Sequence, residues 1–425
     1  MSSWRPTAGL VRACLLAFGG ATGGLVLGQE VLLVLGAPFV LLAVMGVLHR
    51  PVRQPAVRTV IDHGRLHEGQ GTTVRVEVDD LAGVEHVARV ASPPAHVGTR
   101  PRYGAVGSLV ADGLPVLEVS PRRWGRRELG VERVALTSHW AGWRWGPADM
   151  PEHGVLVLPQ ATPYDSRAEV PQPDGLVGSH RSRRLGSGTD FEGIRHFTAG
   201  DRLKRITWPV SLRTGELHVV TTRAEQDAGV WLVVDALRDI GESGGIDGAA
   251  STLDLTVRAA SALAEHHVRT GDRVGLLVLS SDPVRIGLGS GPRHLQRLQG
   301  TLARVRADAR SEPPERLDLG AGAGSVVHVL SPMLFTPLVT ATAGLLRGGT
   351  AVVVIDTLGG HGSAPDPDPL ALTSLAGRMQ RIERDDRLRR LAELGCPVVA
   401  WRGPGTLDTV LRQLARRGRV PKVRA

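Results

Sequence analysis

Two long apolar segments open the chain, at about residues 10–28 and 31–48, and only two polar residues separate them. Each segment is long enough to cross the hydrocarbon core of a bilayer, about 30 Å thick, as a single helix. The pattern predicts a transmembrane helical hairpin within residues 1–50. The alternative is a secretory signal peptide, but no small-residue cleavage site is evident and a second apolar run follows at once. Small residues that would let the two helices approach closely are Gly19, Gly20, Gly23 and Gly24.

Apolar and polar positions then alternate in short runs from residue 57 to residue 160, with Gly, Pro and Asp between them. This spacing is typical of an antiparallel sandwich. We therefore expect a small β-sandwich-like domain over about residues 55–160. The clearest runs are Thr72–Val78, Val84–Val90, Leu114–Val119 and Gly154–Leu158.

An arginine-rich run at residues 122–127 could form a nucleic-acid patch. A strand with a solvated arginine face and a buried Trp124 explains the same residues more simply. We also expect Trp140, Trp143 and Trp145 to pack within this domain or against its neighbour.

The carboxyl-terminal part, from residue 229, alternates near-continuous Val, Leu and Ile runs with helical patterns. Such runs are typical of strands buried on both faces of a parallel sheet. The β-α-β-α order predicts a doubly wound α/β domain over residues 229–425, with ligands expected beyond the carboxyl ends of its strands. The predicted strands are 230–235, 273–280, 325–330, 350–356 and 397–401, with a short antiparallel edge strand at 283–288. The predicted helices are 249–269, 292–306, 335–347, 369–394 and 405–417.

Charge suggests how the hairpin is oriented. Arginines flank it on both sides, Arg5 and Arg12 before it and Arg50, Arg53 and Arg58 after it, and none lies in the turn. The positive-inside rule therefore predicts that both ends of the hairpin, and the bulk of the chain, are cytoplasmic. The net charge of +9 is scattered among acidic residues, so a solvated surface explains most of it.

Composition removes some classes of function. Aromatic residues make up only 4% of the chain, which argues against base-stacking surfaces, and we expect no nucleic-acid partner. The two cysteines, Cys14 and Cys396, cannot form a disulfide framework, and both are expected to be small buried side chains in a reducing compartment.

Between the two predicted domains, residues 161–228 read as an irregular linker followed by a dense motif. The linker ends in a Gly/Ser-rich loop with Arg181, Arg183 and Arg184. These arginines could contact anionic lipid or an acidic partner, and a merely solvated loop is the alternative.

The motif at residues 188–225 resembles the signature of the bacterial family known as domain of unknown function 58. The matching positions are Phe191, Arg195, Gly200, Asp201, Arg205, Ile206, Trp208, Arg213, Leu217, Val219 and Glu225. The chain departs from the family pattern at His196 and Phe197, where Glu-Tyr is usual, and at Pro209 and Leu212.

The resemblance implies an α/β domain similar to von Willebrand factor A folds. It also implies partners, because genes of this family often neighbour MoxR-type AAA+ ATPases and transglutaminase-like membrane proteins. The residues that the family pattern points to as signature or partner-binding positions are Arg195, Gly200, Asp201, Arg205, Trp208, Arg213 and Glu225.

The basic residues of the motif allow two interpretations. They could pair with acidic neighbours and tie the segment to the sheet, or some could stay free for a carboxylate or phosphate of a partner. Trp208 is expected to be a buried anchor in either case. The basic residues are Arg195, Arg202, Lys204, Arg205 and Arg213, and the acidic ones are Asp190, Asp201, Glu216 and Glu225.

Von Willebrand A domains often bind Mg²⁺ through an Asp-x-Ser-x-Ser loop after the first strand. This chain has Leu237 and Asp239 where the two serines would stand, after Asp235. Asp235, Asp239 and Asp356 are therefore only weak candidates for a Mg²⁺ site, and no catalytic residue or cofactor is expected.

The sequence thus favours a membrane-anchored, non-catalytic cytoplasmic scaffold or adaptor that works with a MoxR-type AAA+ ATPase, and less directly with a transglutaminase-like membrane protein. Its lipid contact would be the inner membrane. The alternative is a metal-dependent ligand-binding or enzymatic von Willebrand A domain.

Overall fold

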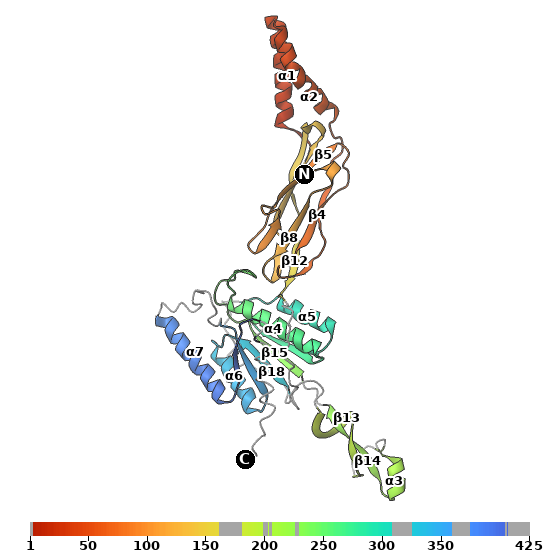
Figure 1. Ribbon diagram of the computed structural model, residues 1–425, viewed down its shortest axis with the longest axis vertical. Helices are drawn as coiled ribbons and strands as arrows, with labels where there is room; N and C mark the ends of the chain where they lie inside the picture. Colours follow the sequence, from red (N-terminus) through yellow and green to blue (C-terminus); the bar gives the residue numbers. More distant parts are fainter. Residues whose placement is uncertain are drawn as a thin grey trace. The chain divides into compact units, whose positions relative to one another are not determined.

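The computed structural model describes residues 3–160, 181–198, 203, 206–225, 229–307, 325–358, 375–403 and 406. The chain forms two compact units. The first comprises residues 1–160 together with the tetrapeptide 244–247, and the second comprises residues 161–243 and 248–425. Figure 1 shows the elements of both units and labels the main ones.

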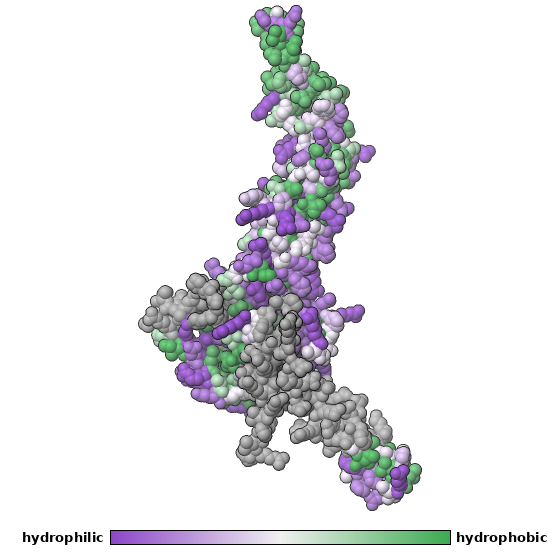
Figure 2. Space-filling view, viewed as in Figure 1, coloured by the Kyte–Doolittle hydropathy of each residue, from purple (hydrophilic) through white to green (hydrophobic). Residues whose placement is uncertain are grey.

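The first unit opens with a helical hairpin, α1 (Ala8–Leu27) and α2 (Glu30–Leu48). Thr7 caps α1, since its hydroxyl accepts a hydrogen bond from the Leu10 N–H at 3.1 Å. Gly28 ends α1 with a left-handed conformation, at φ 58°, which glycine adopts without a Cβ clash. Both helices are long and apolar enough to span a membrane, and their surface is mainly hydrophobic (Figure 2).

Close approach of the two helices depends on glycine, as the sequence predicts. A Cβ atom on Gly20 would lie 3.1 Å from the Leu32 carbonyl oxygen and 3.2 Å from the Cα of Gly36. Gly24 likewise faces the Leu33 side chain, whereas nothing lies within 4 Å of a Cβ on Gly19. The prediction is thus confirmed for one face of α1. The expected burial of Cys14 on this helix is wrong, because its side chain is exposed.

The rest of the first unit is rich in sheet, as expected. A five-stranded sheet has the order β1-β11-β10-β5-β7, a four-stranded sheet β2-β4-β8-β6 and a three-stranded sheet β3-β12-β9. The β3–β12 pair is parallel, so the region is not purely antiparallel. The strand bounds are β1 (Arg5–Pro6), β2 (Val57–Ile61), β3 (Arg65–His67), β4 (Thr72–Val78), β5 (Val84–Ser92), β6 (Val97–Arg100), β7 (Ala105–Leu109), β8 (Val116–Pro121), β9 (Gly125–Glu128), β10 (Val131–Ser138), β11 (Trp143–Met150) and β12 (Gly154–Leu158).

The core of this region lies between strands whose apolar residues alternate with polar ones. Val76 of β4, Val87 of β5 and Leu136 of β10 belong to one buried cluster. Trp145 is buried in the same cluster, and Trp124 is buried as predicted. Trp140 is not, because 49% of its surface is exposed. Its predicted burial is therefore wrong.

The second unit contains a two-stranded sheet and a six-stranded sheet. The small sheet joins β13 (Arg181–His196) to β14 (His218–Glu225), with the short helix α3 (Trp208–Thr214) between them in the chain. The large sheet has the order β17-β16-β15-β18-β19-β20. Its strands are parallel except for the edge strand β17, which is antiparallel as predicted.

Each predicted strand of the large sheet is present within about two residues of its expected bounds. The strands are β15 (Gly229–Asp235), β16 (Arg273–Leu279), β17 (Val284–Gly289), β18 (Val326–Ser331), β19 (Ala351–Asp356) and β20 (Val398–Ala400). The helices are α4 (Thr252–Arg269), α5 (Pro292–Leu302), α6 (Thr336–Arg347) and α7 (Leu375–Glu393). The helix predicted at 405–417 lies outside the described residues, apart from residue 406.

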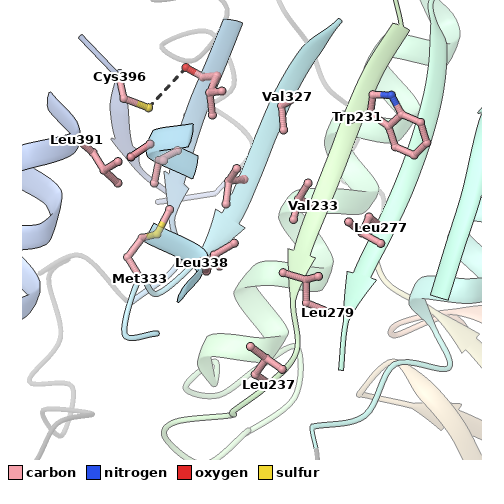
Figure 3. Close-up of a cluster of buried hydrophobic side chains, with 14 residues drawn as sticks. Trp231, Val233, Leu237, Leu277, Leu279, Val327, Met333, Leu338, Leu391 and Cys396 are labelled. Atoms are coloured by element: carbon pink, nitrogen blue, oxygen red, sulfur yellow. Dashed lines mark hydrogen bonds between the residues drawn. The ribbon is translucent and has the colours of Figure 1, made fainter. Parts of the chain in front are cut away.

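Buried side chains fill the space between this sheet and helices α6 and α7 (Figure 3). Every second residue of the strands contributes, including Val233 and Val327, and they meet Leu338 of α6 and Leu391 of α7. Cys396 lies in the same core, where its thiol contacts the Val352 carbonyl oxygen at 3.6 Å. Its predicted burial is confirmed.

Candidate functional site

Two regions of the second unit are candidates for function. One is the carboxyl edge of the six-stranded sheet, where the three weak metal candidates follow parallel strands. The other is the β13–α3–β14 segment, which carries the signature residues.

Asp235, the last residue of β15, is buried and already bonded within the fold. Its carboxylate accepts a hydrogen bond from the Ser331 hydroxyl at 2.6 Å and another from the Leu237 N–H at 3.1 Å. Burial raises the pKa of Asp235, because desolvation disfavours the charged form, and these two hydrogen bonds work in the opposite direction. Ser331 thus fixes the carboxylate from the neighbouring strand β18.

Asp239 supports the start of helix α4. Its carboxylate accepts from the Leu253 N–H at 2.9 Å and from the Thr252 hydroxyl at 3.3 Å. Ser251 and Asp254 form a reciprocal capping box at the same helix end. An acidic side chain at this position satisfies unpaired N–H groups and favours the positive end of the helix dipole. Asp239 is therefore committed to a structural role.

Asp356, the last residue of β19, forms an ion pair with Arg384 of helix α7. The Arg384 guanidinium is buried and also donates to the Pro332 carbonyl oxygen at 2.7 Å. Asp356 further accepts from the Leu358 N–H at 3.0 Å. A protein cation thus neutralises this carboxylate at the sheet edge.

The three candidate acids do not assemble into a metal site. Among the described residues, no group of three or more His, Cys, Asp or Glu side chains converges to hold an ion. Asp235, Asp239 and Asp356 each have a separate partner within the fold. The residues present therefore do not fit a resident Mg²⁺ ion. The sequence could not reveal this, because Asp356 and the Arg384 that neutralises it lie on different elements, β19 and α7.

A buried polar cluster on α4 was not anticipated from the sequence. The Nδ1 atom of His267 lies 2.8 Å from an Asp272 carboxylate oxygen, and its ring centroid lies 5.2 Å from that of His328 in β18. Burial, followed by the charges of His267 and His266, holds the pKa of His328 well below its usual value. All three side chains are almost fully enclosed, so the cluster lacks access to a substrate.

In the signature segment, helix α3 is fixed by a polar residue. The Ser211 hydroxyl accepts from the His218 N–H at 2.9 Å and donates to the Thr207 carbonyl oxygen at 3.0 Å. Ser211 is buried. Val219 of β14 is buried too, and its backbone forms an isolated antiparallel β-bridge with Ile206. The inward face of α3 is thus held by hydrogen bonds.

The outward face of α3 is apolar instead. Trp208 is 58% exposed and Leu212, one helical turn later, is 81% exposed. The predicted burial of Trp208 is therefore wrong. Two apolar residues four positions apart, such as Trp208 and Leu212, normally lie on the helix face that packs on a core. In α3 the buried face instead carries Ser211. Leu203, Ile194 and Leu217 are further exposed apolar residues of the segment.

The other signature residues differ in their surroundings. Arg195 donates to the His196 carbonyl oxygen at 2.9 Å and to the Thr198 hydroxyl at 3.0 Å. Arg213 is exposed, and within the described residues it forms no ion pair. Glu225 ends β14, and its backbone pairs with β13. Gly200, Asp201 and Arg205, with Arg202 and Lys204, lie outside the described residues.

The departure from the family pattern at residue 196 creates a different contact. His196 Nδ1 lies 2.9 Å from the Glu216 carboxylate, and its ring lies 4.4 Å from the ring of His218 on the opposite strand. Glu216, which one interpretation of the sequence paired with a basic residue of the motif, thus contacts a histidine. The pairing supports the hairpin on its solvent side, where both groups are well exposed.

These features describe a mixed α/β domain whose acidic strand ends are satisfied internally, and a signature helix with an exposed apolar face. The model of the family "Protein of unknown function DUF58" matches residues 193–357, from β13 to the end of β19. Over 134 residues the chain is 30% identical to uncharacterized proteins of Mycobacterium bovis and Mycobacterium tuberculosis. The match covers 31% of this chain and 41% of each relative, so the chain spans about two fifths of their length.

Proposed function

We propose that this protein is a membrane-anchored, non-catalytic cytoplasmic scaffold that docks a partner protein through the signature helix α3. The observation that carries the proposal is the exposure of Trp208 and Leu212, inside the region that matches the family. Large apolar side chains in adjacent turns of an exposed helix are typical of a protein–protein contact.

The state of the acidic strand ends supports a binding role over a catalytic one. Asp235 is bonded to Ser331, Asp239 to the start of α4, and Asp356 to Arg384. A general acid or base needs access to a substrate, and these three groups serve the fold instead. The domain would therefore contribute a shaped surface.

We further propose that the domain is similar to a von Willebrand factor A fold. The support is the strand order β17-β16-β15-β18-β19-β20 with a single antiparallel edge strand. In such sheets the strand order reverses between the first and fourth strands, here β15 and β18, and ligands bind beyond that point. Asp235 and Ser331 occupy it in this chain.

The proposed anchor is the hairpin of α1 and α2, whose two helices pass the length and hydropathy criteria for membrane spans. A two-helix hairpin returns the chain to the side from which it entered. The flanking arginines then favour the cytoplasmic side for the remaining chain. The partner class that we propose is a MoxR-type AAA+ ATPase, and a transglutaminase-like membrane protein is a second partner in the same assembly.

Affinity purification of the full chain from detergent extract tests the docking helix. The wild-type protein, in the presence of a non-hydrolysable ATP analogue, should recover an ATPase of the AAA+ class. The double variant Trp208→Ala/Leu212→Ala should not recover the ATPase, because it removes the apolar contact surface of α3. Both side chains are exposed, so their loss should leave the fold intact. Met379→Ala, an exposed apolar residue on α7, is the matched control and should retain the ATPase. Equal recovery with all three proteins would contradict the assignment of α3.

The alternative function is a metal-dependent von Willebrand A domain, favoured only by the position of Asp235 and Asp356 at strand ends. Titration calorimetry of the detergent-solubilised chain with Mg²⁺ distinguishes the two. No saturable heat is expected. A saturable signal that Asp235→Ala abolishes would favour the alternative.

A further inference from the structure

The base of the helical hairpin contacts a turn of the β-strand region. This turn, η2 (His139–Ala141) with Gly142, lies between the start of α1 and the end of α2. The Thr7 N–H donates to the Gly142 carbonyl oxygen at 2.9 Å, and the Thr7 hydroxyl donates to the Ala141 carbonyl oxygen at 2.7 Å. On the other side, a Cβ atom on Gly142 would lie 2.9 Å from the Cα of Gly46. The turn is thus level with the ends of both apolar helices.

Two tryptophans, Trp143 and Trp4, lie at the base of the hairpin beside this turn. Trp143 donates its indole N–H to the Gly46 carbonyl oxygen at 2.8 Å, and Arg50 lies over its ring, 4.7 Å from the centroid. Trp4 donates its indole N–H to the Arg53 carbonyl oxygen at 2.9 Å. Tryptophan is enriched at the membrane–water interface, because its ring is apolar and its N–H is polar.

Trp140 is held outward at an energetic cost. It is half exposed and adopts a left-handed backbone conformation, at φ 60°, and the next residue, Ala141, does so too, at φ 49°. For a non-glycine residue this conformation is unfavourable, because the Cβ atom comes too close to the following carbonyl oxygen. The Glu85 carboxylate stabilises it by accepting the Trp140 N–H at 3.0 Å. Strain of this kind is often retained where a side chain is presented to a ligand.

Positive charge gathers beside the tryptophans. Arg5 and Arg144 are direct neighbours across the β1–β11 pair, and both are exposed. Within the described residues neither forms an ion pair. Like charges placed opposite each other on two strands repel, so an anion between them would stabilise the pair. The nearby acids are already engaged, since Asp79 and Asp80 accept backbone N–H groups and Glu85 holds Trp140.

We propose that this collar, made of Trp4, Arg5, Arg50, Trp140, Trp143 and Arg144, binds the headgroup layer of an anionic phospholipid membrane. The Trp140 ring inserts among the headgroups, and the Arg5–Arg144 pair takes a lipid phosphate, which guanidinium groups bind with two hydrogen bonds. The inference rests on the membrane anchoring proposed above and adds the lipid class and the residues that contact it.

Depth of insertion is the first test. The full chain, with Cys14→Ser and Cys396→Ser, carries a fluorophore at Trp140→Cys or, as the control, at Tyr103→Cys. Tyr103 is 85% exposed in the same unit. It precedes β7, whose first residue pairs with Val90 near the end of β5, whereas Trp140 contacts Glu85 at the start of β5. In vesicles of phosphatidylcholine and phosphatidylglycerol, headgroup spin-labelled lipid should quench the label at position 140 several-fold more than the label at 103. Equal quenching would overturn the proposal.

Charge is the second test. Arg5→Gln/Arg144→Gln should remove the difference in Trp140-site quenching between vesicles with and without phosphatidylglycerol. The matched control, Arg58→Gln/Arg133→Gln, removes two exposed arginines that have their own acids, Glu77 and Asp149, and should keep the difference. If both double variants behave alike, the phosphate site is refuted. Inorganic phosphate, at an ionic strength matched with chloride, should not abolish the difference; if it does, the site takes a free anion and not a lipid.

An alkaline carbonate wash distinguishes failure of the proposed membrane anchor from failure of the collar alone. If the wash extracts the protein from the vesicles, the hairpin is not a membrane anchor and both proposals fail. If the protein is retained but the labels at 140 and 103 respond equally, the anchor stands and only the collar is refuted.

Discussion

At the scale of single residues, the partners of the strand-end carboxylates determine which acidic groups are open to a ligand. Asp235 is enclosed and bonded to Ser331, and Asp356 is neutralised by Arg384. The polar groups at the carboxyl edge of the sheet are thus satisfied from within, whereas the apolar Trp208 faces solvent. Residue types alone suggest the reverse arrangement, with acids open to a ligand and a tryptophan inside.

Replacement of Asp235 by asparagine should stabilise the fold at neutral pH. The raised pKa of this carboxyl means that the folded state holds its proton more tightly than the unfolded state does. The contribution of the Asp235 carboxyl to the stability of the fold is therefore fully present below its pKa in the unfolded state. It is lost as the pH rises through its pKa in the folded state. Asparagine has no charge to desolvate, its amide oxygen can still accept from the Leu237 N–H, and its amide N–H can donate to the Ser331 hydroxyl oxygen. The denaturation midpoint in urea at pH 7 should rise, and a fall would contradict the assignment.

His328 should make the second unit sensitive to acid. Its pKa is lowered by burial and by His267 and His266, so the unfolded state binds a proton at a higher pH than the folded state does. Its contribution to stability is present above the unfolded pKa, about 6.5, and is lost as the pH falls through the folded value. The slope from this one group is at most about 1.4 kcal/mol per pH unit.

Urea unfolding of the full chain in detergent between pH 5 and pH 8 measures this effect. His328→Leu should flatten the decline on the acid side, because it replaces a buried imidazole by an apolar group. His63→Leu, which removes an exposed histidine, should leave the decline unchanged. The same slope in both variants would show that another group is responsible.

At the scale of elements, glycine position sets how α1 meets α2. A Cβ atom on Gly20 would press against the backbone of α2, whereas one on Gly19 would have open space. Gly20→Val should therefore separate the helices and cost about 1–3 kcal/mol by overpacking. Gly19→Val carries the same change in helix propensity without the clash. Thermal unfolding in detergent, followed by tryptophan fluorescence, should show a lower midpoint for Gly20→Val alone.

Helix α3 illustrates a second rule at this scale. Trp208 and Leu212 have the spacing of a core-facing pair, yet the helix has seven residues and docks through the Ser211 hydroxyl. So short a helix can be held by a few hydrogen bonds to a strand. Its apolar face then remains available for a partner, which is the basis of the proposed docking role.

At the scale of the whole molecule, the sidedness of the membrane is the most consequential prediction. In a background without native cysteines, Tyr103→Cys should react with a membrane-impermeant maleimide only after the cells are permeabilised. Gln29→Cys, at the turn of the hairpin, should react in intact cells. The reason is that arginines flank the hairpin and none lies in its turn. The opposite labelling pattern would place the bulk of the chain outside and refute the cytoplasmic scaffold.

The sequence by itself determined many elements of this protein, but it did not predict β13, α3 and β14, which form where an irregular linker and a motif were expected. Runs of apolar residues gave the two hairpin helices and five strands of the large sheet nearly to the residue, and the alternation over 72–78 and 154–158 gave β4 and β12. The antiparallel edge strand β17 was also predicted. Local periodicity suffices here, because burial on one or both faces of an element is written into neighbouring positions.

Only the tertiary structure decided which side chains meet. Arg384 reaches Asp356, His267 meets His328, and Thr7 and Gly46 enclose the turn that presents Trp140. These contacts join residues distant in the chain, and local patterns do not encode them. Trp208 was expected to be buried but is exposed, because the hydrogen bond that the Ser211 hydroxyl accepts from β14 determines which face of α3 turns inward.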